Sequence, residues 1–136
     1  MFHKEFYPTP DAVIDIMLDK IKDSARYYLD PSAGKGDVVD KIHQRNRWVK
    51  VSVDCIEINH DLASILSNKN CRVVGDDFLN YVGVCYYDAI VMNPPFSNGV
   101  DHLLKAWEFI YEGEIVCLLN ANTCLLYTSP SPRDRG

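Results

Sequence analysis

The sequence has no excess of positive charge: 14 lysines and arginines stand against 19 aspartates and glutamates, which gives a net charge of −5. A protein that holds nucleic acid by its phosphates needs clustered Lys and Arg side chains. The composition therefore argues against a chain that binds DNA or RNA by itself. If the substrate is a nucleic acid, most contacts to its backbone have to come from another region.

Long apolar runs and metal-binding cysteine patterns are also missing. No apolar stretch approaches the roughly 18 residues of a membrane span, and charged residues near the N-terminus argue against a signal peptide. The five cysteines form no C-x-x-C pair and no Cys/His cluster. Cys55, Cys71 and Cys117 fall in or beside predicted strands, where we expect buried free thiols. These features predict a cytoplasmic protein with no membrane or metal partner.

The glycine-rich loop at residues 30–37, Asp-Pro-Ser-Ala-Gly-Lys-Gly-Asp, lacks both common phosphate fingerprints. Val39 replaces the third glycine of G-x-G-x-x-G, and Lys35 is not followed by Ser or Thr as in a P-loop. Asp30 and Asp37 would repel a pyrophosphate but suit a cation such as an ammonium or a sulfonium. The loop is interpreted as a site for a cationic small molecule, with an ordinary tight turn as the alternative.

Short apolar runs alternate with amphipathic segments along the rest of the chain. Strands are predicted at residues 26–30, 49–57, 72–75, 87–92 and 114–120, and helices at 11–21, 38–46, 60–67 and 100–111. Leu103, Leu104, Trp107 and Ile110 are expected on the buried face of the last helix. This order predicts an α/β fold with a doubly wound, mostly parallel sheet.

Candidate binding residues stand where the predicted strands end, which is the ligand-binding edge of an open α/β sheet. Glu57 ends the second strand and could accept two hydrogen bonds from a ribose diol. Asp77 and Phe78 follow the third strand. An extended segment at residues 7–10, Tyr-Pro-Thr-Pro, is either a lead-in to the first helix or a cover over a ligand.

The fourth predicted strand ends abruptly in Asn93, Pro94, Pro95 and Phe96. The two prolines lack backbone N–H groups and fix φ, so the strand stops there and the turn is stiff. An amide and a phenyl ring are therefore held rigidly at the end of a buried strand. A plain strand-terminating turn is the alternative.

Taken in order, these segments resemble the N-terminal half of a class I S-adenosylmethionine-dependent methyltransferase. The branch in question methylates the 6-amino group of adenine in DNA and occurs in phages and restriction–modification systems. The resemblance spans residue 6 to about residue 123. It implies a Rossmann-like fold, S-adenosyl-L-methionine as cofactor and double-stranded DNA as partner. It also implies cofactor contacts from Tyr7, Pro8, Thr9, Asp30, Pro31, Ala33, Gly34, Gly36, Glu57, Asp77, Phe78 and Asn93.

The resemblance assigns a role to each part of this set. The glycine-rich loop would run along the methionine part of the cofactor, and Glu57 would hold the ribose hydroxyls. Asp77 would face the adenine amine, with Phe78 against the ring. Tyr7 and the residues after it would cover the cofactor, which favours the second interpretation of that segment.

The catalytic residues implied are Asn93, Pro94, Pro95 and Phe96. An adenine 6-amino group is a poor nucleophile because its lone pair is delocalised into the ring. The Asn93 side-chain oxygen and the Pro94 carbonyl can accept both amine hydrogens and localise the lone pair toward the methyl donor. No catalytic base, cysteine nucleophile or metal is required. The base must be flipped out of the duplex, and Phe96 would stack on it.

The last residues have a different origin by the same kind of comparison. Residues 124–134, Cys-Leu-Leu-Tyr-Thr-Ser-Pro-Ser-Pro-Arg-Asp, resemble one reading frame of a transposase adapter used in sequencing libraries. We therefore expect residues 1–123 to be an incomplete methyltransferase domain and residues 124–136 to be a non-native tail. The target-recognition region that would hold DNA would be missing. The fifth strand would be an exposed apolar edge, and the chain alone would be inactive or unstable.

Three alternatives remain open at this point. The same fold could methylate a protein glutamine or an adenine in RNA, although the Tyr-Pro-Thr-Pro segment favours DNA. A non-catalytic cofactor-binding module would keep the pocket without turnover. A nicotinamide-dependent oxidoreductase is disfavoured by the missing third glycine.

Overall fold

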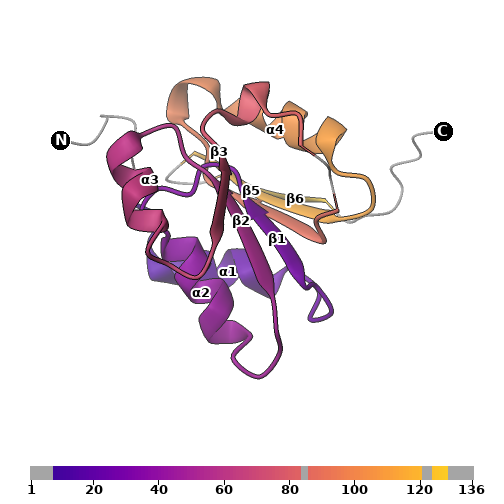
Figure 1. The fold of residues 1–136 in the computed structure, drawn as a ribbon. Coiled ribbons are helices and arrows are strands. Elements are labelled where there is room, and N and C mark those ends of the chain that lie inside the picture. Colours follow the sequence, from indigo (N-terminus) through magenta and orange to yellow (C-terminus); the bar gives the residue numbers. More distant parts are fainter. Residues whose placement is uncertain (1–7, 84–85, 121–123, 129–136) are drawn as a thin grey trace.

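The computed structural model describes residues 8–83, 86–120 and 124–128, which form one twisted sheet with helices on both faces (Figure 1). The sheet has six strands in the order β3-β2-β1-β4-β5-β6. Its strands are β1 (Tyr27–Asp30), β2 (Ser52–Ile56), β3 (Arg72–Gly75), β4 (Ala89–Met92), β5 (Glu114–Asn120) and β6 (Cys124–Thr128). Strands β1 to β5 are parallel to one another, and β6 runs antiparallel to β5.

The helices form the two outer layers. They are α1 (Asp11–Asp19), α2 (Asp37–Arg45), α3 (His60–Leu66) and α4 (Gly99–Phe109), with the short 3₁₀ turns η1 (Phe78–Asn80) and η2 (Phe96–Asn98). In Figure 1, α1 and α2 cover one face of the sheet and α4 covers the other. The prediction of a doubly wound, mostly parallel α/β sheet is confirmed.

Strand β4 is the continuous apolar run at Ala89–Met92, and it lies in the middle of the sheet. All four of its residues are fully buried. Ala89 and Val91 pack into the core on the α1 and α2 side, whereas Ile90 and Met92 pack into the core on the α4 side. A central parallel strand is covered on both faces, so both of its side-chain rows must be apolar.

The predicted free thiols are confirmed for the cysteines whose side chains the structure describes. Cys55 and Cys117 are buried and Cys71 is partly buried, and all three are free. Cys55 donates a hydrogen bond to Cys71, and this bond lowers the pKa of the Cys71 thiol.

The expected buried face of α4 is only partly confirmed: Ile110 is 2% exposed and Leu103 packs against the same core, but the other two residues differ. Leu104 is 54% exposed and Trp107 is 40% exposed, while Gly99, His102 and Ala106 face the interior. The reason is the closeness of the helix to the sheet. A Cβ added at Gly99 would lie 3.2 Å from Leu119 Cδ2 in β5, so small residues set the contact face.

The expectation that β5 would be an exposed edge is also wrong. Its described partner β6 pairs with it from Ile115 opposite Thr128 to Leu118 opposite Leu125. The Tyr127 hydroxyl in β6 donates a 2.6 Å hydrogen bond to the buried carboxylate of Glu114. Strand β6 is therefore the outer strand on this side of the sheet.

Candidate functional site

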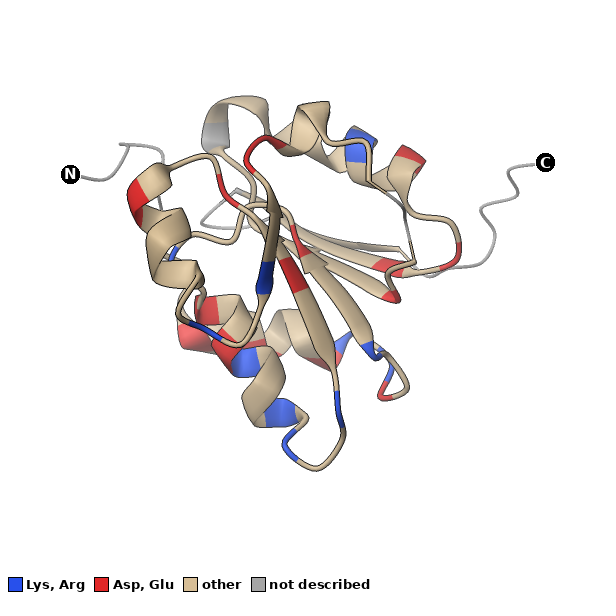
Figure 2. Cartoon of the chain, viewed as in Figure 1, with Lys and Arg blue, Asp and Glu red and all other residues tan. Residues whose placement is uncertain are grey.

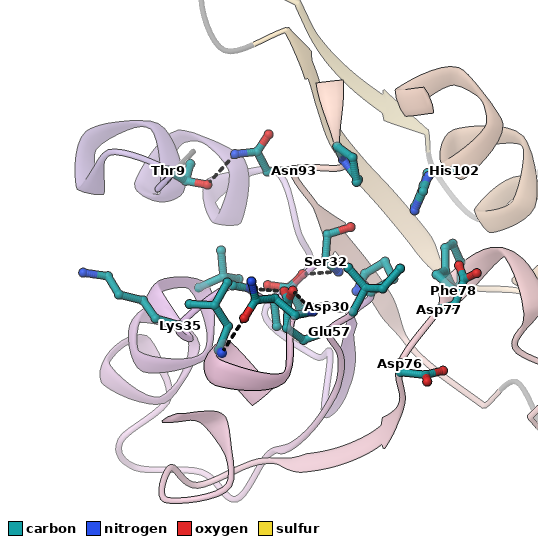
Figure 3. A pocket seen from close by; sticks show the side chains of 18 of the residues that line it. Thr9, Asp30, Ser32, Lys35, Glu57, Asp76, Asp77, Phe78, Asn93 and His102 are labelled. Atoms are coloured by element: carbon teal, nitrogen blue, oxygen red, sulfur yellow. Dashed lines mark hydrogen bonds between the residues drawn. The ribbon is translucent and has the colours of Figure 1, made fainter. Parts of the chain in front are cut away.

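A cavity of about 600 Å³ opens at the carboxyl ends of β1, β2, β3 and β4. This is the edge at which open α/β sheets bind ligands. Figure 3 shows side chains that reach the cavity from several separate segments. Among the predicted site residues, those that line it are Pro8, Thr9, Asp30, Pro31, Ala33, Gly34, Glu57, Asp77, Phe78, Asn93 and Pro95.

The other predicted site residues are not among those that the structure shows to line the cavity. Gly36 and Pro94 are buried and do not line the cavity. Tyr7 lies outside the described residues. The backbone of Phe96 belongs to η2, but its side chain lies outside what the structure describes.

The loop between β1 and α2 depends on two glycines with left-handed backbone. Gly34 has a φ of 59° and Gly36 a φ of 98°, values that residues with a Cβ rarely adopt. The turn is closed by a 3.0 Å hydrogen bond from Gly36 N to the carbonyl of Ala33. Gly36 thus shapes the loop from behind, where a Cβ would lie 2.9 Å from Lys69 Cδ.

Asp30 is a buried carboxyl at the end of β1, and only 2% of it is exposed. Burial raises the pKa of Asp30 to about 7, and the nearby charge of Glu57 also raises it. The backbone N–H of Ser32, which donates to Oδ1 at 3.1 Å, acts in the opposite direction. Asp30 is therefore a group that ionises near neutral pH and that gains from a nearby cation.

Glu57 ties the end of β2 to the glycine-rich loop. Its Oε1 accepts from Gly34 N at 2.7 Å, and its Oε2 accepts from Asn59 N at 2.9 Å. Each carboxylate oxygen has further acceptor capacity, so these two bonds position the group without using it up. Glu57 remains able to receive hydroxyl donors from the cavity.

Asp77 and Phe78 follow β3 and form its side of the cavity. Asp77 caps η1, with Oδ1 accepting from Leu79 N at 3.1 Å and Oδ2 from Asn80 Nδ2 at 2.8 Å. Phe78 is 1% exposed and makes an edge-to-face contact with Phe109, with ring centroids 6.0 Å apart. Both side chains are held by local contacts before any ligand binds.

Asn93 stands directly after β4 and faces the N-terminal segment. Its Nδ2 donates a 2.9 Å hydrogen bond to Thr9 Oγ1, across 84 positions of sequence (Figure 3). Thr9 is 9% exposed. This contact brings Pro8 and Thr9 onto the cavity wall, whereas Pro10 takes the N-cap position of α1.

Sequence reasoning missed several polar residues of the cavity wall, among them Ser32, Asn98 and His102. His102 is 6% exposed, its Nδ1 lies 3.0 Å from the Asn98 carbonyl oxygen, and its ring centroid lies 6.0 Å from that of Phe78. The available signal was the spacing of Gly99 and Ala106, three before and four after the histidine, because small residues indicate the face of a helix that packs most closely.

Within residues 8–83, 86–120 and 124–128, no group of three or more His, Cys, Asp or Glu side chains could hold a metal ion. No helix in the described ranges is both long enough and apolar enough to cross a membrane.

Comparisons with known proteins give a fold but no family. No protein-family model matches the sequence, and a search of curated proteins finds no match. Among solved structures, coclaurine N-methyltransferase is similar with a TM-score of 0.62 and 19% identity, over 85% of this chain and 39% of that one. Geranyl diphosphate methyltransferase has a TM-score of 0.64 and 16% identity, over 78% of this chain and 47% of that one.

A third structure, from Pyrococcus horikoshii, is described as a candidate RNA methyltransferase. It has a TM-score of 0.63 and 21% identity, over 85% of this chain and 62% of that one. The chain therefore spans between 39% and 62% of the length of these three structures. Its fold is the Rossmann-like α/β fold of the class I methyltransferases.

Proposed function

We propose that this chain is the cofactor-binding part of an enzyme that transfers a methyl group from S-adenosyl-L-methionine to the 6-amino group of an adenine in double-stranded DNA. The observation that carries the proposal is the amide of Asn93. It is fixed by Thr9 at the end of β4, on the wall of a cavity that also contains Asp30 and Glu57. An acceptor for an amine thus shares one cavity with carboxylates suited to a cation and a ribose.

The residues present fit S-adenosyl-L-methionine. The cavity of about 600 Å³ lies within the usual range for small-molecule sites, about 300–1,000 Å³. Asp30 lies where a negative charge would attract the ammonium or sulfonium, and Glu57 has acceptor capacity for the ribose hydroxyls. When bound, the cofactor supplies the methyl group as an electrophile on a sulfonium. The solved coclaurine and geranyl diphosphate methyltransferases contain S-adenosylhomocysteine and S-adenosylmethionine, respectively, which supports this choice.

The chain's own contribution to the reaction is to hold the amine. Asn93 Oδ1, on the cavity wall, would accept one of its hydrogens, which localises the nitrogen lone pair and aims it at the methyl group. The second acceptor expected from the sequence, the Pro94 carbonyl, belongs to a buried residue and would have to be reached from the edge of the cavity. The bound cofactor would supply the methyl group, and the surplus proton of the amine held by Asn93 would pass to solvent. The Thr9 contact supports this role because it prevents the Asn93 amide from rotating.

The charge distribution is consistent with DNA being held by a further region. Figure 2 shows blue basic segments mainly around α2 and the loops at the amino ends of the strands. The cavity wall carries the acidic side chains of Asp61, Asp76 and Asp77 and also Lys35. A phosphate backbone needs Lys and Arg. We therefore infer that the target-recognition surface is outside this chain. The proposed substrate also gives Phe96 a role, which is to stack on the flipped base.

Two alternative substrates rest on the same amine-holding geometry. An adenine in RNA is favoured by the similarity to the Pyrococcus horikoshii protein described as a candidate RNA methyltransferase. A protein glutamine would present an amide nitrogen to the same two acceptors. The three substrates share the cofactor site and differ in what approaches it.

Transfer of labelled methyl groups separates these substrates. The longer protein that contains this chain would be incubated with labelled cofactor and with duplex DNA, RNA or a glutamine peptide. Label is expected in DNA, and label confined to RNA or peptide would reassign the substrate. Asn93→Ala should reduce transfer by at least about a hundredfold, as loss of an essential electrostatic contact does. Asn68→Ala, at an exposed residue outside the cavity, is the matched control. Unchanged transfer by Asn93→Ala would refute the proposed role.

A further inference from the structure

The corner of the cavity formed by η2 and α4 contains a buried histidine that the proposed function has not used. His102 lines the cavity and is 6% exposed, and its Nδ1 lies 3.0 Å from the Asn98 carbonyl oxygen. A carbonyl can only accept a hydrogen bond, so Nδ1 carries the proton. In the neutral ring, Nε2 is therefore a hydrogen-bond acceptor.

Asn98 supplies a second acceptor at the same corner. It occupies the N-cap position of α4, where an asparagine side chain usually accepts from the first turn of the helix. Asn98 makes no such bond, and its Oδ1 is buried without a partner among the described residues. Asn59, the N-cap of α3, behaves as expected and accepts from Asp61 N at 2.9 Å and Leu62 N at 3.1 Å.

This contrast indicates that Asn98 Oδ1 is available to a ligand. A buried acceptor with no partner destabilises the protein unless another donor reaches it. Because Asn98 lines the cavity, that donor can come from a bound molecule. The corner thus presents two acceptors, Asn98 Oδ1 and His102 Nε2, and selects for a group that donates hydrogen bonds.

The position of the corner identifies which part of the ligand it meets. The ring centroid of His102 lies 6.0 Å from that of Phe78, which follows Asp77 at the end of β3. In Figure 3, His102, Phe78 and Asp77 lie on one side of the cavity, and Asn93 and Thr9 lie on the other. The two acceptors therefore face the half of the cavity that is distant from the methyl-transfer end, where the purine of the cofactor would lie.

We propose that Asn98 and His102 bind the exocyclic amine of the cofactor's purine ring and so select adenosine over inosine. This inference rests on the proposed function for the identity of the cofactor. The amine carries two hydrogens, which match the two acceptors of this corner. A carbonyl oxygen at the same ring position would face acceptors only, and buried polar groups left unpaired are a strong source of selectivity.

Calorimetric titration of the chain with S-adenosylhomocysteine and with S-inosylhomocysteine tests this selectivity. The two probes differ at the purine 6-position, where an amine is replaced by a carbonyl oxygen and the neighbouring ring nitrogen gains a proton. We expect the adenosyl compound to bind about 5- to 150-fold more tightly, the range for leaving one buried acceptor unpaired. His102→Phe and Asn98→Ala should each reduce this ratio. His102→Gln, whose amide reaches the position of Nε2, should largely keep it.

Lys35→Ala serves as the matched control because Lys35 lines the cavity away from His102 (Figure 3). The ratio of its affinities for the adenosyl and inosyl compounds should equal that of the wild type, even if both affinities change. Equal wild-type affinities for the two probes would overturn the inference and leave the proposed function standing. A full ratio in both His102→Phe and Asn98→Ala would overturn it as well. If His102→Phe does not fold, Asn98→Ala and the wild-type ratio decide. Absence of any saturable binding by the wild type would instead contradict the proposed function.

Discussion

Thr9 accepts a hydrogen bond of 2.9 Å from the side-chain nitrogen of Asn93, although 84 positions separate them in the sequence. Thr9 precedes the first helix, and Asn93 ends the central strand β4. Their contact fixes the amide that we propose to hold the substrate amine. It also holds Pro8 and Thr9 against the cavity, so the position of the N-terminal segment and that of the Asn93 amide depend on the same hydrogen bond.

Substitution of Thr9 tests this dependence. Thr9→Val keeps the shape but removes the only acceptor atom of the side chain, and Asn93 Nδ2 loses this partner. We expect the free energy of unfolding to fall by about 0.5–1.5 kcal/mol, the usual net contribution of one hydrogen bond. Thr9→Ser keeps the hydroxyl and should lose less. Urea denaturation measures both, and equal stability of Thr9→Val and wild type would show that the contact contributes nothing.

Replacement of Asp30 tests the effect of its burial on stability. The pKa of Asp30 is raised from 3.8 to about 7 in the folded state. Between these values the folded chain holds a proton that the unfolded chain has lost, so stability falls as pH rises from about 4 to 7. Asp30→Asn lacks this penalty. It should be more stable than wild type above pH 7, by up to about 4 kcal/mol, and the difference should vanish near pH 4.

The same raised pKa of Asp30 predicts a pH dependence of cofactor binding. If the ionised carboxylate attracts the cationic ligand, the binding-competent fraction rises from about one tenth at pH 6 to about nine tenths at pH 8. The affinity for S-adenosylmethionine should then rise about tenfold over this interval. Asp30→Asn should bind more weakly at pH 8 and show no such rise. A wild-type affinity that is constant from pH 6 to 8 would exclude this role for Asp30.

Gly36 tests whether backbone conformation or space controls the glycine-rich loop. Gly36→Ala should lower the free energy of unfolding by about 1–2 kcal/mol, because its φ of 98° disfavours a residue with a Cβ. Lys69→Ala removes the side chain that a Cβ at this position would meet at 2.9 Å. A double-mutant cycle by urea denaturation separates the two effects. Full rescue of Gly36→Ala by Lys69→Ala would mean that space, and not φ, is decisive.

Local signals in the sequence were sufficient to predict where the strands lie and which edge of the sheet carries the site. Gly75 ends β3, and Pro94 and Pro95 follow β4, so strand ends could be placed by residues that cannot continue a strand. The apolar run at Ala89–Met92 requires cover on both faces, and this gave the layered architecture. Since parallel strands end at one edge, the positions of Asp30 and Glu57 at the ends of β1 and β2 bring both to the same cavity.

Contacts that depend on the close approach of separate elements could not be predicted in this way. Leu104 and Trp107 were wrongly expected to be buried, because hydrophobicity alone does not indicate that a helix packs through Gly99 and Ala106. The Thr9–Asn93 bond and the unpaired Oδ1 of Asn98 have no local signature. The pairing of β6 with β5 was unexpected for the same reason. The non-native origin of residues 124–136 stays a prediction, and genomic DNA that encodes these residues would contradict it.

The central claim is that the cavity at the ends of β1 to β4 binds S-adenosyl-L-methionine, and calorimetric titration of the chain tests it most directly. At pH 8, where Asp30 is ionised, we predict saturable binding of one molecule per chain. Glu57→Ala should weaken it, because both the ribose contact and the bond to Gly34 N are lost. Absence of saturable binding by a folded wild-type chain would contradict the account.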